Sequence, residues 1–425
     1  MTPPSYRPAR ISVIVASRGR PRELRRCLDA LEQAVWPLVE VIVVADSAGR
    51  AAAGDRTGAQ VVAFDEPNLA AARNAGLRAA GGDIVAFIDD DSVPEPMWLA
   101  ALAGAFTDGA VGAATGPVLG RNGISLQSGA ETILSDATTV PATGVTASRR
   151  ARPGSAPKTV GTNMAFRADL IRAAGGFDET FRFYLEDADL DMRLGKMGAV
   201  TAYVACAVVH HGTAASVRRR SDRAPLDLTD IGRSTAAFLL RHHPADRVDE
   251  ALSAAREREW RRAVRGIQSG ALEPRDMRRL MAGFDAGARE GLEAGRPQLA
   301  AFGPPPPFRP RAAHPARHAI VAGLGAQRPV ARAKAEALRE AGATVSLFLF
   351  SQTTLYHHVR HDGGIWVQTG GLWGRSDRSG PLLRRASGLS RLEAEVARVA
   401  GPRGFDGKLE ALLQQGIPTE RFPFF

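Results

Sequence analysis

The chain has 425 residues, enough for two or three domains, and its 44% hydrophobic and 24% charged content suits a globular protein with a sizeable core. The net charge of +10 fits a phosphate-bearing substrate, a nucleic acid or an anionic membrane surface, without choosing among them. In the longest stretch without Asp, Glu, Lys or Arg, residues 197–217, the apolar part is about ten residues, short of the roughly 20 that a membrane helix needs. We therefore expect a soluble or peripheral protein with two buried free thiols, Cys27 and Cys206.

Strand and helix patterns alternate through the N-terminal part. Short apolar runs predict buried strands at residues 11–16, 41–44, 61–64 and 84–88. Apolar residues spaced three and four apart predict a helix that begins at Pro21, and an Ala-rich pattern predicts another over residues 69–80. This alternation with short connections predicts an α/β fold with a mostly parallel sheet and right-handed crossovers.

The rest of the chain changes character several times. Over residues 116–158 Gly, Ser, Thr and Pro dominate, so we expect an irregular excursion with at least one mobile loop. A helix is predicted to begin just after Glu186-Asp187, and a buried strand over residues 199–209 to end at His210-His211. An Arg-rich helical segment, a Pro-rich linker and a β-α-β unit follow. We expect three parts, with a small C-terminal α/β domain of unknown role, at residues 1–240, 241–312 and 313–425.

Three aspartates follow the buried run at residues 84–88 directly. Carboxylates gathered at the carboxyl end of a buried strand repel one another unless a cation or hydrogen-bond donors neutralise them. Because alternate residues of an extended chain point the same way, Asp89 and Asp91 can face one ion while Asp90 faces elsewhere. Such hard oxygen ligands suit Mg²⁺ or Mn²⁺, which often also bind substrate phosphates. An acidic loop or helix entry without any ion is the alternative.

Polar or acidic clusters stand at several predicted strand ends. They are Ser17-Arg18, Asp46, the three aspartates, Glu186-Asp187 and His210. The segments around them are ISVIVASRGRPRELRRCLDAL, EVIVVADS, NLAAARNAGLRAAGGDIVAFIDDDSVP, GTNMAFRADLIRAAGGFDETF, EDADLDMRLGKMG and VVHH. In wording, order and spacing they resemble the inverting glycosyltransferases of family 2. The resemblance covers residues 10–215 and implies a GT-A type nucleotide-binding sheet flanked by helices.

The resemblance also implies which residues bind a sugar nucleotide and its metal. Residues that resemble the nucleotide contacts of the family are Ser17, Arg18, Asp46, Arg73, Asn74, Asp89 and Asp90. Ala45 departs from the family, which usually has a second polar residue there. Asp89 and Asp91 resemble the D-x-D site for Mn²⁺ or Mg²⁺, and His210 resembles the late histidine that completes metal or pyrophosphate binding. Its rival His211 is placed with Asn163 on the acceptor or phosphate side. A surface arginine at position 73 and a structural histidine at position 210 are the alternatives.

Asp187 resembles the catalytic base of the family. Direct displacement at an anomeric carbon needs a group that takes the proton of the attacking hydroxyl. A carboxylate at a helix N-terminus is favoured by the helix dipole, so Asp187 suits this task at neutral pH. Its neighbour Glu186 could hydrogen-bond an acceptor hydroxyl. The alternative for Asp187 is a plain helix N-cap.

The sequence thus favours an inverting, metal-dependent glycosyltransferase of hexosyltransferase type. We expect a donor carrying UDP, dTDP or GDP, and a saccharide or lipid-linked acceptor used in polysaccharide or glycoconjugate synthesis. A cytoplasmic protein, with possible peripheral contact at the inner face of the membrane and no nucleic-acid partner, is expected. The donor sugar, its base and the acceptor are not determined by these residues.

Two other functions would fit parts of this pattern. A nucleotidyltransferase of similar fold would carry a Gly-rich loop after the first strand, whereas SRGRPRE has a single glycine. A non-catalytic sugar-nucleotide-binding or scaffold protein would not need the full set of site residues. In the C-terminal part, Trp366 and Trp373 could line a carbohydrate site or form the core of a hairpin.

Overall fold

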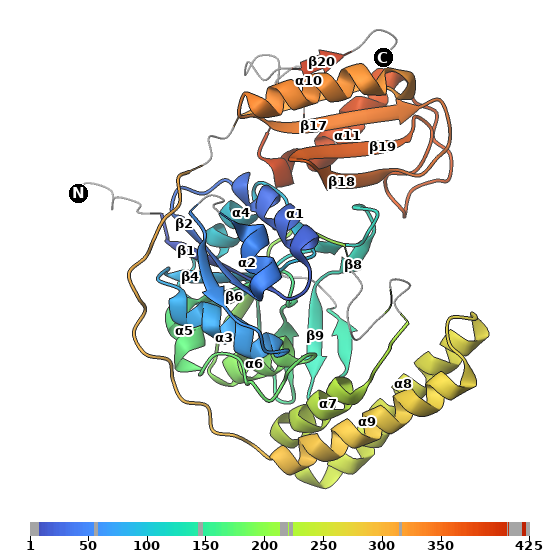
Figure 1. Ribbon diagram of the computed structural model, residues 1–425. Coiled ribbons are helices and arrows are strands. Elements are labelled where there is room, and N and C mark those ends of the chain that lie inside the picture. Colours follow the sequence, from blue (N-terminus) through green and yellow to red (C-terminus); the bar gives the residue numbers. More distant parts are fainter. Residues whose placement is uncertain are drawn as a thin grey trace.

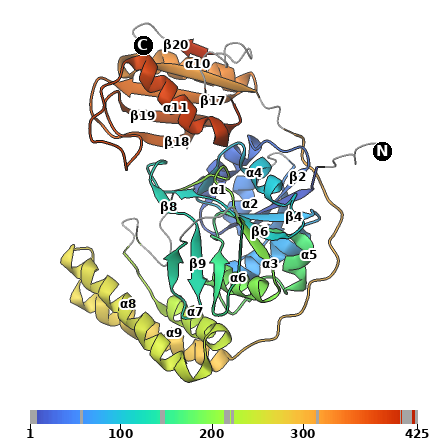
Figure 2. The same ribbon diagram turned by 180° about the vertical axis from the view of Figure 1, so that it is seen from behind.

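The fold is described from a computed structural model (Figure 1). The residues that it describes are 8–54, 58–142, 148–212, 220, 224–313, 317–405, 407 and 419–421. Within these ranges the chain forms a central sheet flanked by helices, a helical arm and a second, C-terminal sheet. Figure 2, the view from behind, shows the helical arm and the C-terminal sheet on opposite sides of the central sheet.

A mostly parallel sheet of eight strands forms the centre of the N-terminal part. Its order is β11-β14-β6-β13-β4-β1-β2-β3, in which β13 and β11 run antiparallel to their neighbours. The strands are β1 (Ile11–Ser17), β2 (Val39–Ala45), β3 (Gln60–Ala63), β4 (Ile84–Asp89), β6 (Val111–Thr115), β11 (Ser148–Arg150), β13 (Met164–Arg167) and β14 (Val200–Tyr203). The α/β class with a mostly parallel sheet, expected from the sequence, is confirmed.

Helices cover both faces of this sheet. On one face lie α1 (Pro21–Glu32), α2 (Ser47–Ala53) and α4 (Trp98–Ala105). On the other lie α3 (Leu69–Ala79), α5 (Ala168–Ala173) and α6 (Glu186–Lys196). Cys27 is buried in α1 as expected, but the expectation for Cys206 was wrong because this residue is exposed. The strand predicted over residues 199–209 is interrupted there by a turn, and a separate strand, β15 (Val209–His211), follows.

The excursion over residues 116–158 contains strands where irregular structure was expected. One small sheet has the order β5-β15-β7-β8 and another the order β10-β9-β12. Their remaining members are β5 (Ser92–Pro94), β7 (Val118–Leu119), β8 (Leu126–Ser128), β9 (Glu131–Leu134), β10 (Thr139–Pro141) and β12 (Ser155–Lys158). These strands are two to four residues long. So short a strand shows too little alternation between apolar and polar residues to be recognised in the sequence.

The helical arm consists of α7 (Thr229–His242), α8 (Val248–Gln268) and α9 (Pro274–Ala294), with a short 3-10 turn η1 (Ala245–Arg247) before α8. Glycines let α7 and α9 approach closely, because a Cβ on Gly287 would collide with the Thr229 carbonyl and one on Gly232 with that of Phe284. As α7 begins before residue 240 and packs along α9, we propose that the N-terminal domain ends before α7. Among the helices of the described residues, none is both long and apolar enough to cross a membrane.

The Pro-rich stretch after the arm, residues 299–311, lies along the N-terminal domain and is called the strap below. Phe302 packs into the core beneath α3 and α5, and the Arg311 N–H donates to the Val39 carbonyl at 2.7 Å. The buried carboxylate of Glu40 accepts hydrogen bonds from the main-chain N–H groups of Gly81 (2.7 Å) and Arg309 (2.8 Å). The strap is therefore fastened at several points along its length.

The C-terminal part is a second α/β sheet with the order β18-β19-β17-β16-β20, in which only β18 is antiparallel among the described strands. Its strands are β16 (His318–Leu324), β17 (Thr344–Ser351), β18 (His358–Asp362), β19 (Ile365–Gly371) and β20 (Thr419–Arg421). After a 3-10 turn η2 (Gly325–Gln327), α10 (Arg328–Glu340) packs on one face. The other face is covered by α11 (Gly388–Arg403).

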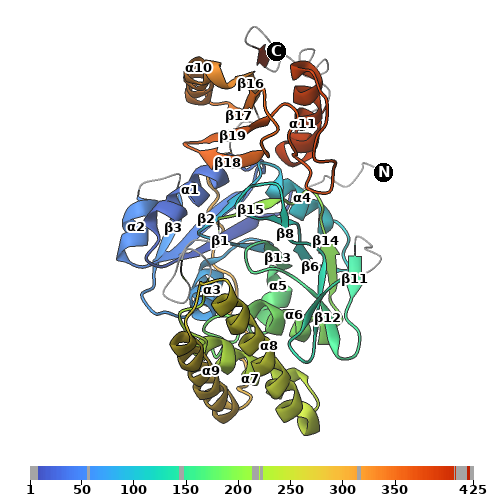
Figure 3. The same ribbon diagram turned by 90° about the vertical axis from the view of Figure 1, so that its right-hand side faces the viewer.

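The C-terminal sheet rests on the N-terminal domain beside α1 (Figure 3). Trp366, at the start of β19, is 1% exposed and packs with Ala30 and Val93 of the N-terminal domain. Its indole N–H donates to the Gln33 side chain at 3.1 Å. Of the two interpretations of Trp366, the structure supports a core residue, because a ring buried between domains cannot stack on a sugar.

Replacing Glu40 by leucine should loosen the strap, because the N–H groups of Gly81 and Arg309 lose their common acceptor. Leaving buried donors unsatisfied should lower the free energy of unfolding by about 1–3 kcal/mol, measured by urea denaturation. Limited proteolysis with thermolysin should cut residues 299–311 faster than in the wild-type protein. The surface replacement Glu340→Leu is the control, and a Glu40→Leu protein with wild-type cleavage would show that other contacts hold the strap.

Candidate active site

The candidate site lies where β1, β2 and β4 end at one edge of the central sheet. Ser17 is the last residue of β1, Asp46 follows β2 and Asp89 is the last residue of β4. The register pairs Ala16 with Asp89 and Ser17 with Ala45, so these strand ends are level with one another. The carboxyl edge of a parallel sheet is where α/β proteins generally bind ligands.

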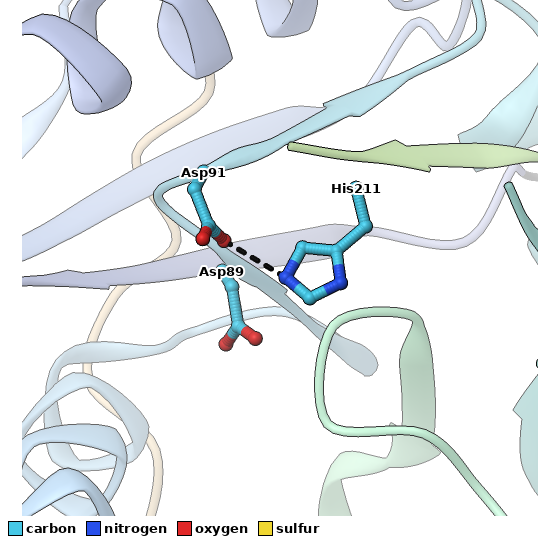
Figure 4. Close-up of side chains that lie close together, drawn as sticks. All are labelled: Asp89, Asp91 and His211. Atoms are coloured by element: carbon cyan, nitrogen blue, oxygen red, sulfur yellow. Dashed lines mark ion pairs between the residues drawn. The ribbon is translucent and has the colours of Figure 1, made fainter. Parts of the chain in front are cut away.

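Asp89, Asp91 and His211 form a group that could hold a metal ion (Figure 4). One ligand atom of each lies within 4.8 Å of the others, and the His211 Nε2 is 3.1 Å from the Asp91 Oδ1. Asp91 is buried, while the side chain of Asp89 is 31% exposed. Two carboxylates and an imidazole at this spacing fit one divalent cation with further positions left for a substrate.

A short strand pair decides which histidine joins this group. In the antiparallel pair of β5 and β15, His211 lies opposite Ser92 and His210 opposite Val93. Successive side chains of a strand point to opposite faces. His210 therefore points away from the aspartates, and its Nε2 lies 2.8 Å from the Glu95 Oε1. The structure places His211 at the aspartates, where the family resemblance had suggested His210.

Asp90 is held by the first loop and shares the Arg20 Nη1 with Asp91. Its carboxylate accepts hydrogen bonds from Ser17 Oγ at 2.8 Å and from Arg20 Nη1 at 3.0 Å. Burial and the neighbouring aspartates raise the pKa of Asp90 to about 7, although Arg20 and Ser17 lower it. Sequence reasoning missed Arg20, whose guanidinium also lies 3.4 Å from Asp91; its only signal was a second arginine in the SRGR turn.

Asp187 stands at the N-terminus of α6 across from the aspartates. Its Oδ2 accepts a hydrogen bond from the Gly161 N–H at 3.0 Å. The two residues before the helix, Tyr184 and Leu185, have φ values of +75° and +65°, in the left-handed region that non-glycine residues seldom adopt. Such strain, of order 1–3 kcal/mol per residue, is typically stored at functional sites. Here it sets the direction in which the first turn of α6 enters the site.

Arg73 joins the end of β4, which carries Asp89, to the start of α6, which carries Glu186. Its guanidinium is buried and donates to Asp89 Oδ1 (3.0 Å), Glu186 Oε1 (2.7 Å) and the Gly161 carbonyl (3.0 Å). Burial and the charges of Asp187 and Asp89 raise the pKa of Glu186, while Arg73 lowers it. Because Arg73 is occupied by carboxylates, its place near the base and phosphates of a nucleotide remains a proposal. Glu186 is likewise occupied by Arg73.

The other predicted residues mostly hold the backbone. Asn74 is buried and exchanges hydrogen bonds with the main chain of Phe177. Asn163 is completely buried, accepting from Trp98 Nε1 and donating to the Ala207 carbonyl at 2.8 Å each. This burial leaves Asn163 no surface for an acceptor or phosphate, so that prediction is not supported.

Two residues of the nucleotide set lie at the rim of the site. Asp46 accepts from the Gly49 N–H, capping α2, and from the Gly19 N–H of the first loop. Arg18 is exposed, and its Nε donates to the Asp65 carbonyl at 3.2 Å. Both side chains retain access to solvent, which is compatible with the contacts expected of them.

The excursion over residues 116–158 supplies side chains that sequence reasoning missed. Lys158 Nζ lies 3.6 Å from Glu131 and 3.9 Å from Asp187. Burial lowers the pKa of Lys158, but Asp187 and Glu131 outweigh it and the pKa is raised. Gln127 lies 2.9 Å from the Nδ1 of His211. None of these residues belongs to a motif in the sequence.

A buried ion cluster fixes α6 to the helical arm. Asp189 lies beside Arg193 (2.8 Å), Arg241 (3.0 Å) and His242 (2.9 Å). Burial works against ionisation, but Arg193, the His242 hydrogen bond and Arg241 together lower the pKa of Asp189. The pKa of His242 is itself lowered, chiefly by burial, so the arginines supply the balancing charge while neutral His242 donates a hydrogen bond.

Parts of this chain are similar to known proteins. Residues 12–175 match the family model described as glycosyl transferase family 2. A pre-mycofactocin glycosyltransferase of Mycobacterium tuberculosis is 31% identical over 253 residues, covering 56% of this chain and 49% of that protein. The O-antigen biosynthesis protein RfbC of Myxococcus xanthus is 27% identical over 241 residues, covering 51% and 18%. An N-acetylglucosaminyl-diphospho-decaprenol L-rhamnosyltransferase of M. tuberculosis is 32% identical over 112 residues, covering 26% and 31%.

The chain thus spans about half or less of the length of these curated relatives. Among solved structures, the mannosyltransferase PcManGT from Pyrobaculum calidifontis, in complex with GDP-Man and Mn²⁺, aligns with a TM-score of 0.39 and 19% identity over 68% of this chain and 88% of that one. GalNAc-T7 with UDP, GalNAc and Mn²⁺ aligns with a TM-score of 0.41 and 15% identity over 54% and 47%. Neither likeness is close enough to assign the role of a residue.

The contribution of Asp189 to the free energy of unfolding should depend on pH. A carboxyl whose pKa is lowered by folding stabilises the fold above its unfolded pKa, about 3.9, and loses this contribution as the pH falls further. At pH 7, Asp189→Asn should lower the free energy of unfolding by about 3 kcal/mol, since it removes the buried carboxylate that balances Arg193 and that shares Arg241 with Asp178. The difference from the wild-type protein should shrink below about pH 4, measured by urea denaturation. Asp169→Asn, an exposed aspartate in α5, is the control; a difference independent of pH would contradict this account.

Proposed function

We propose, from the glycosyltransferase family 2 domain that this chain carries, that the protein is an inverting, metal-dependent glycosyltransferase. It moves a sugar from a nucleotide-diphosphate sugar to an acceptor hydroxyl. The observation that supports this most directly is the bridge made by Arg73. One guanidinium contacts Asp89 of the candidate metal group and the Gly161 carbonyl, while the Gly161 N–H contacts Asp187. A metal group and a candidate base therefore face the same edge of the sheet.

Asp89, Asp91 and His211 would hold Mn²⁺ or Mg²⁺. A bound ion would neutralise the diphosphate of the donor as the sugar leaves. The protein's own contribution is to keep these three ligands together. Asp91 is held by Arg20 and His211, and Asp89 by Arg73, so two arginines balance carboxylate charge before any substrate arrives.

Asp187 is proposed as the general base. One of its oxygens accepts a hydrogen bond from the Gly161 N–H, and the Lys158 ammonium lies 3.9 Å away. The neighbouring described carboxylates are already engaged, Glu186 by Arg73 and Glu131 by Lys158. Asp191, also nearby, is bound by Thr159, so the described residues offer no second free carboxylate beside Asp187 and favour a single displacement with inversion.

The first loop and the end of β2 are proposed to bind the nucleotide. Ser17, Arg18 and Asp46 line that side, and the first loop contributes one glycine, Gly19, rather than the Gly-rich loop of a nucleotidyltransferase. UDP, dTDP and GDP remain the candidate donor nucleotides.

The acceptor is proposed to enter beside Lys158, Glu131 and Gln127, which flank Asp187 and His211. One relative is named for O-antigen biosynthesis, and the name of another includes N-acetylglucosaminyl-diphospho-decaprenol. On that analogy we propose a saccharide or lipid-linked acceptor, polysaccharide or glycoconjugate synthesis, and a cytoplasmic location with peripheral contact at the inner membrane face. A donor screen that measures release of nucleoside diphosphate tests the transferase activity as a whole.

The metal group predicts how the protein responds to Mn²⁺ and a nucleotide. UDP, dTDP or GDP should raise the melting temperature with Mn²⁺ and much less with EDTA, since a ligand at 100 times its Kd stabilises by about 2.7 kcal/mol. Asp91→Asn should lose most of this shift. Asp83→Asn, at the opposite end of β4, should keep it. Full transferase activity in excess EDTA would exclude the metal from the mechanism.

The base predicts a kinetic phenotype. Asp187→Asn keeps the shape of the side chain and removes its basicity, so kcat should fall roughly 10²-fold or more while donor KM changes little. Asp249→Asn, also at a helix N-terminus but in α8, is the matched control. NMR of the product should show inverted anomeric configuration. Retention of configuration, or near-normal turnover by Asp187→Asn, would defeat the mechanism.

A further inference from the structure

Strand β15 has two faces, and the C-terminal domain contacts one of them. His211 faces Asp91 and the candidate metal group. On the opposite face, the His210 Nε2 lies 2.8 Å from Glu95 and its ring centroid is 5.1 Å from that of Trp366. Adjacent residues of one three-residue strand thus join the metal group to the interface between the domains.

Glu95 is the centre of that interface. It is 3% exposed, and besides His210 it accepts hydrogen bonds from Arg403 Nε (3.0 Å) and Nη2 (3.3 Å). Burial alone would raise the pKa of Glu95, but Arg403 and His210 outweigh it and lower the pKa to about 2. Glu95 is therefore a buried carboxylate that depends on a residue of the other domain for its charge balance.

Arg403 reaches Glu95 from the last turn of α11. It is 1% exposed, donates also to Ser346 Oγ at 2.8 Å, and its guanidinium carbon lies 4.8 Å from the centre of the Trp366 ring. The main chain makes a second contact at the same place: the Met97 N–H donates to the Pro402 carbonyl at 2.8 Å. Side chain and backbone of α11 together hold the segment that directly follows β5.

We propose that Arg403 is a positioning residue for the metal site, acting through Glu95 and His210 to hold β15 where His211 reaches Asp91. This rests on the proposed function, since it assigns to the C-terminal domain a part in the same site. Stability alone does not explain the contact: a buried ion pair is often no more stabilising than well-packed apolar residues, whereas its directional hydrogen bonds fix geometry. The C-terminal domain is on this account part of the donor and metal site, although it contributes no ligand.

The interface offers a matched control. Gln33, the residue that caps the C-terminus of α1, accepts from the Trp366 indole and donates to the Gly364 carbonyl at 2.6 Å, so it joins the same two domains. These described contacts of Gln33 do not involve β5 or β15. Gln33→Ala therefore weakens the interface through Trp366, which also packs against His210 and Arg403, without removing a hydrogen bond among Arg403, Glu95 and His210.

The test compares full-length wild-type, Arg403→Met, Arg403→Lys and Gln33→Ala proteins. Mn²⁺ binding is measured by electron paramagnetic resonance of the free ion, and the His211 imidazole is followed by NMR in metal-free protein, assigned with His211→Gln. Arg403→Met should weaken Mn²⁺ binding by about 10-fold or more, the usual effect of removing a group that orients metal ligands, and should shift the His211 resonance. Arg403→Lys, which keeps the charge but not the fork of donors, should show a smaller loss in the same direction. Gln33→Ala should show neither change.

A folded Arg403→Met protein with wild-type Mn²⁺ affinity and an unmoved His211 resonance would overturn the proposal. If Arg403→Met does not fold, the same two results for Arg403→Lys decide it. Failure of the proposed function looks different. Wild-type protein would then bind no Mn²⁺, while the His211 resonance would still report whether Arg403 positions that residue.

Discussion

The site depends on the neutralisation of carboxylates that are crowded at the end of a buried strand. Two unit charges about 4–5 Å apart repel by roughly 3–4 kcal/mol at an effective dielectric constant of 20. Asp89 and Asp91 approach within this range, and Glu186 and Asp187 face them. Arg20 and Arg73 offset the repulsion from inside the protein. The arginines balance these carboxylates without an ion, and a cation bound at the proposed metal site would add to the same neutralisation.

Several residues predicted to contact the nucleotide or the acceptor also hold the framework of the site. A buried guanidinium must satisfy its donors, and Arg73 does so on Asp89, Glu186 and a carbonyl. Asn74 and Asn163, both buried, use their amides to hold the main chain that surrounds the site. A residue can therefore belong to a recognisable sequence motif because it holds the framework of a site, and not only because it touches a substrate.

Sequence patterns predicted the parts of the structure that follow from local periodicity. The apolar runs that became β1, β2, β3 and β4 located the carboxyl edge, and with it Asp89 and Asp91. They could not distinguish His210 from His211, because a shift of one residue in the pairing of β15 with β5 exchanges the two faces. Lys158 and Arg20 were missed because their partners are distant in sequence, and the short strands around Lys158 show no period. Cys206 was predicted to be buried because its neighbours in the sequence are apolar, but it lies in a turn and is exposed.

The C-terminal half illustrates the same limit at the scale of domains. A Pro-rich stretch normally indicates a spacer between independent units, yet here Glu40 holds the strap and Glu95 holds α11. In both cases a buried carboxylate of the N-terminal domain accepts hydrogen bonds from residues about 270–310 positions further along the chain. Replacing Arg403 by an apolar residue would leave Glu95 buried without its main counter-charge, which costs more than a lost surface contact. The N-terminal domain thus depends on the C-terminal domain to balance Glu95, a buried charge that lies beside His210 and behind the proposed metal site.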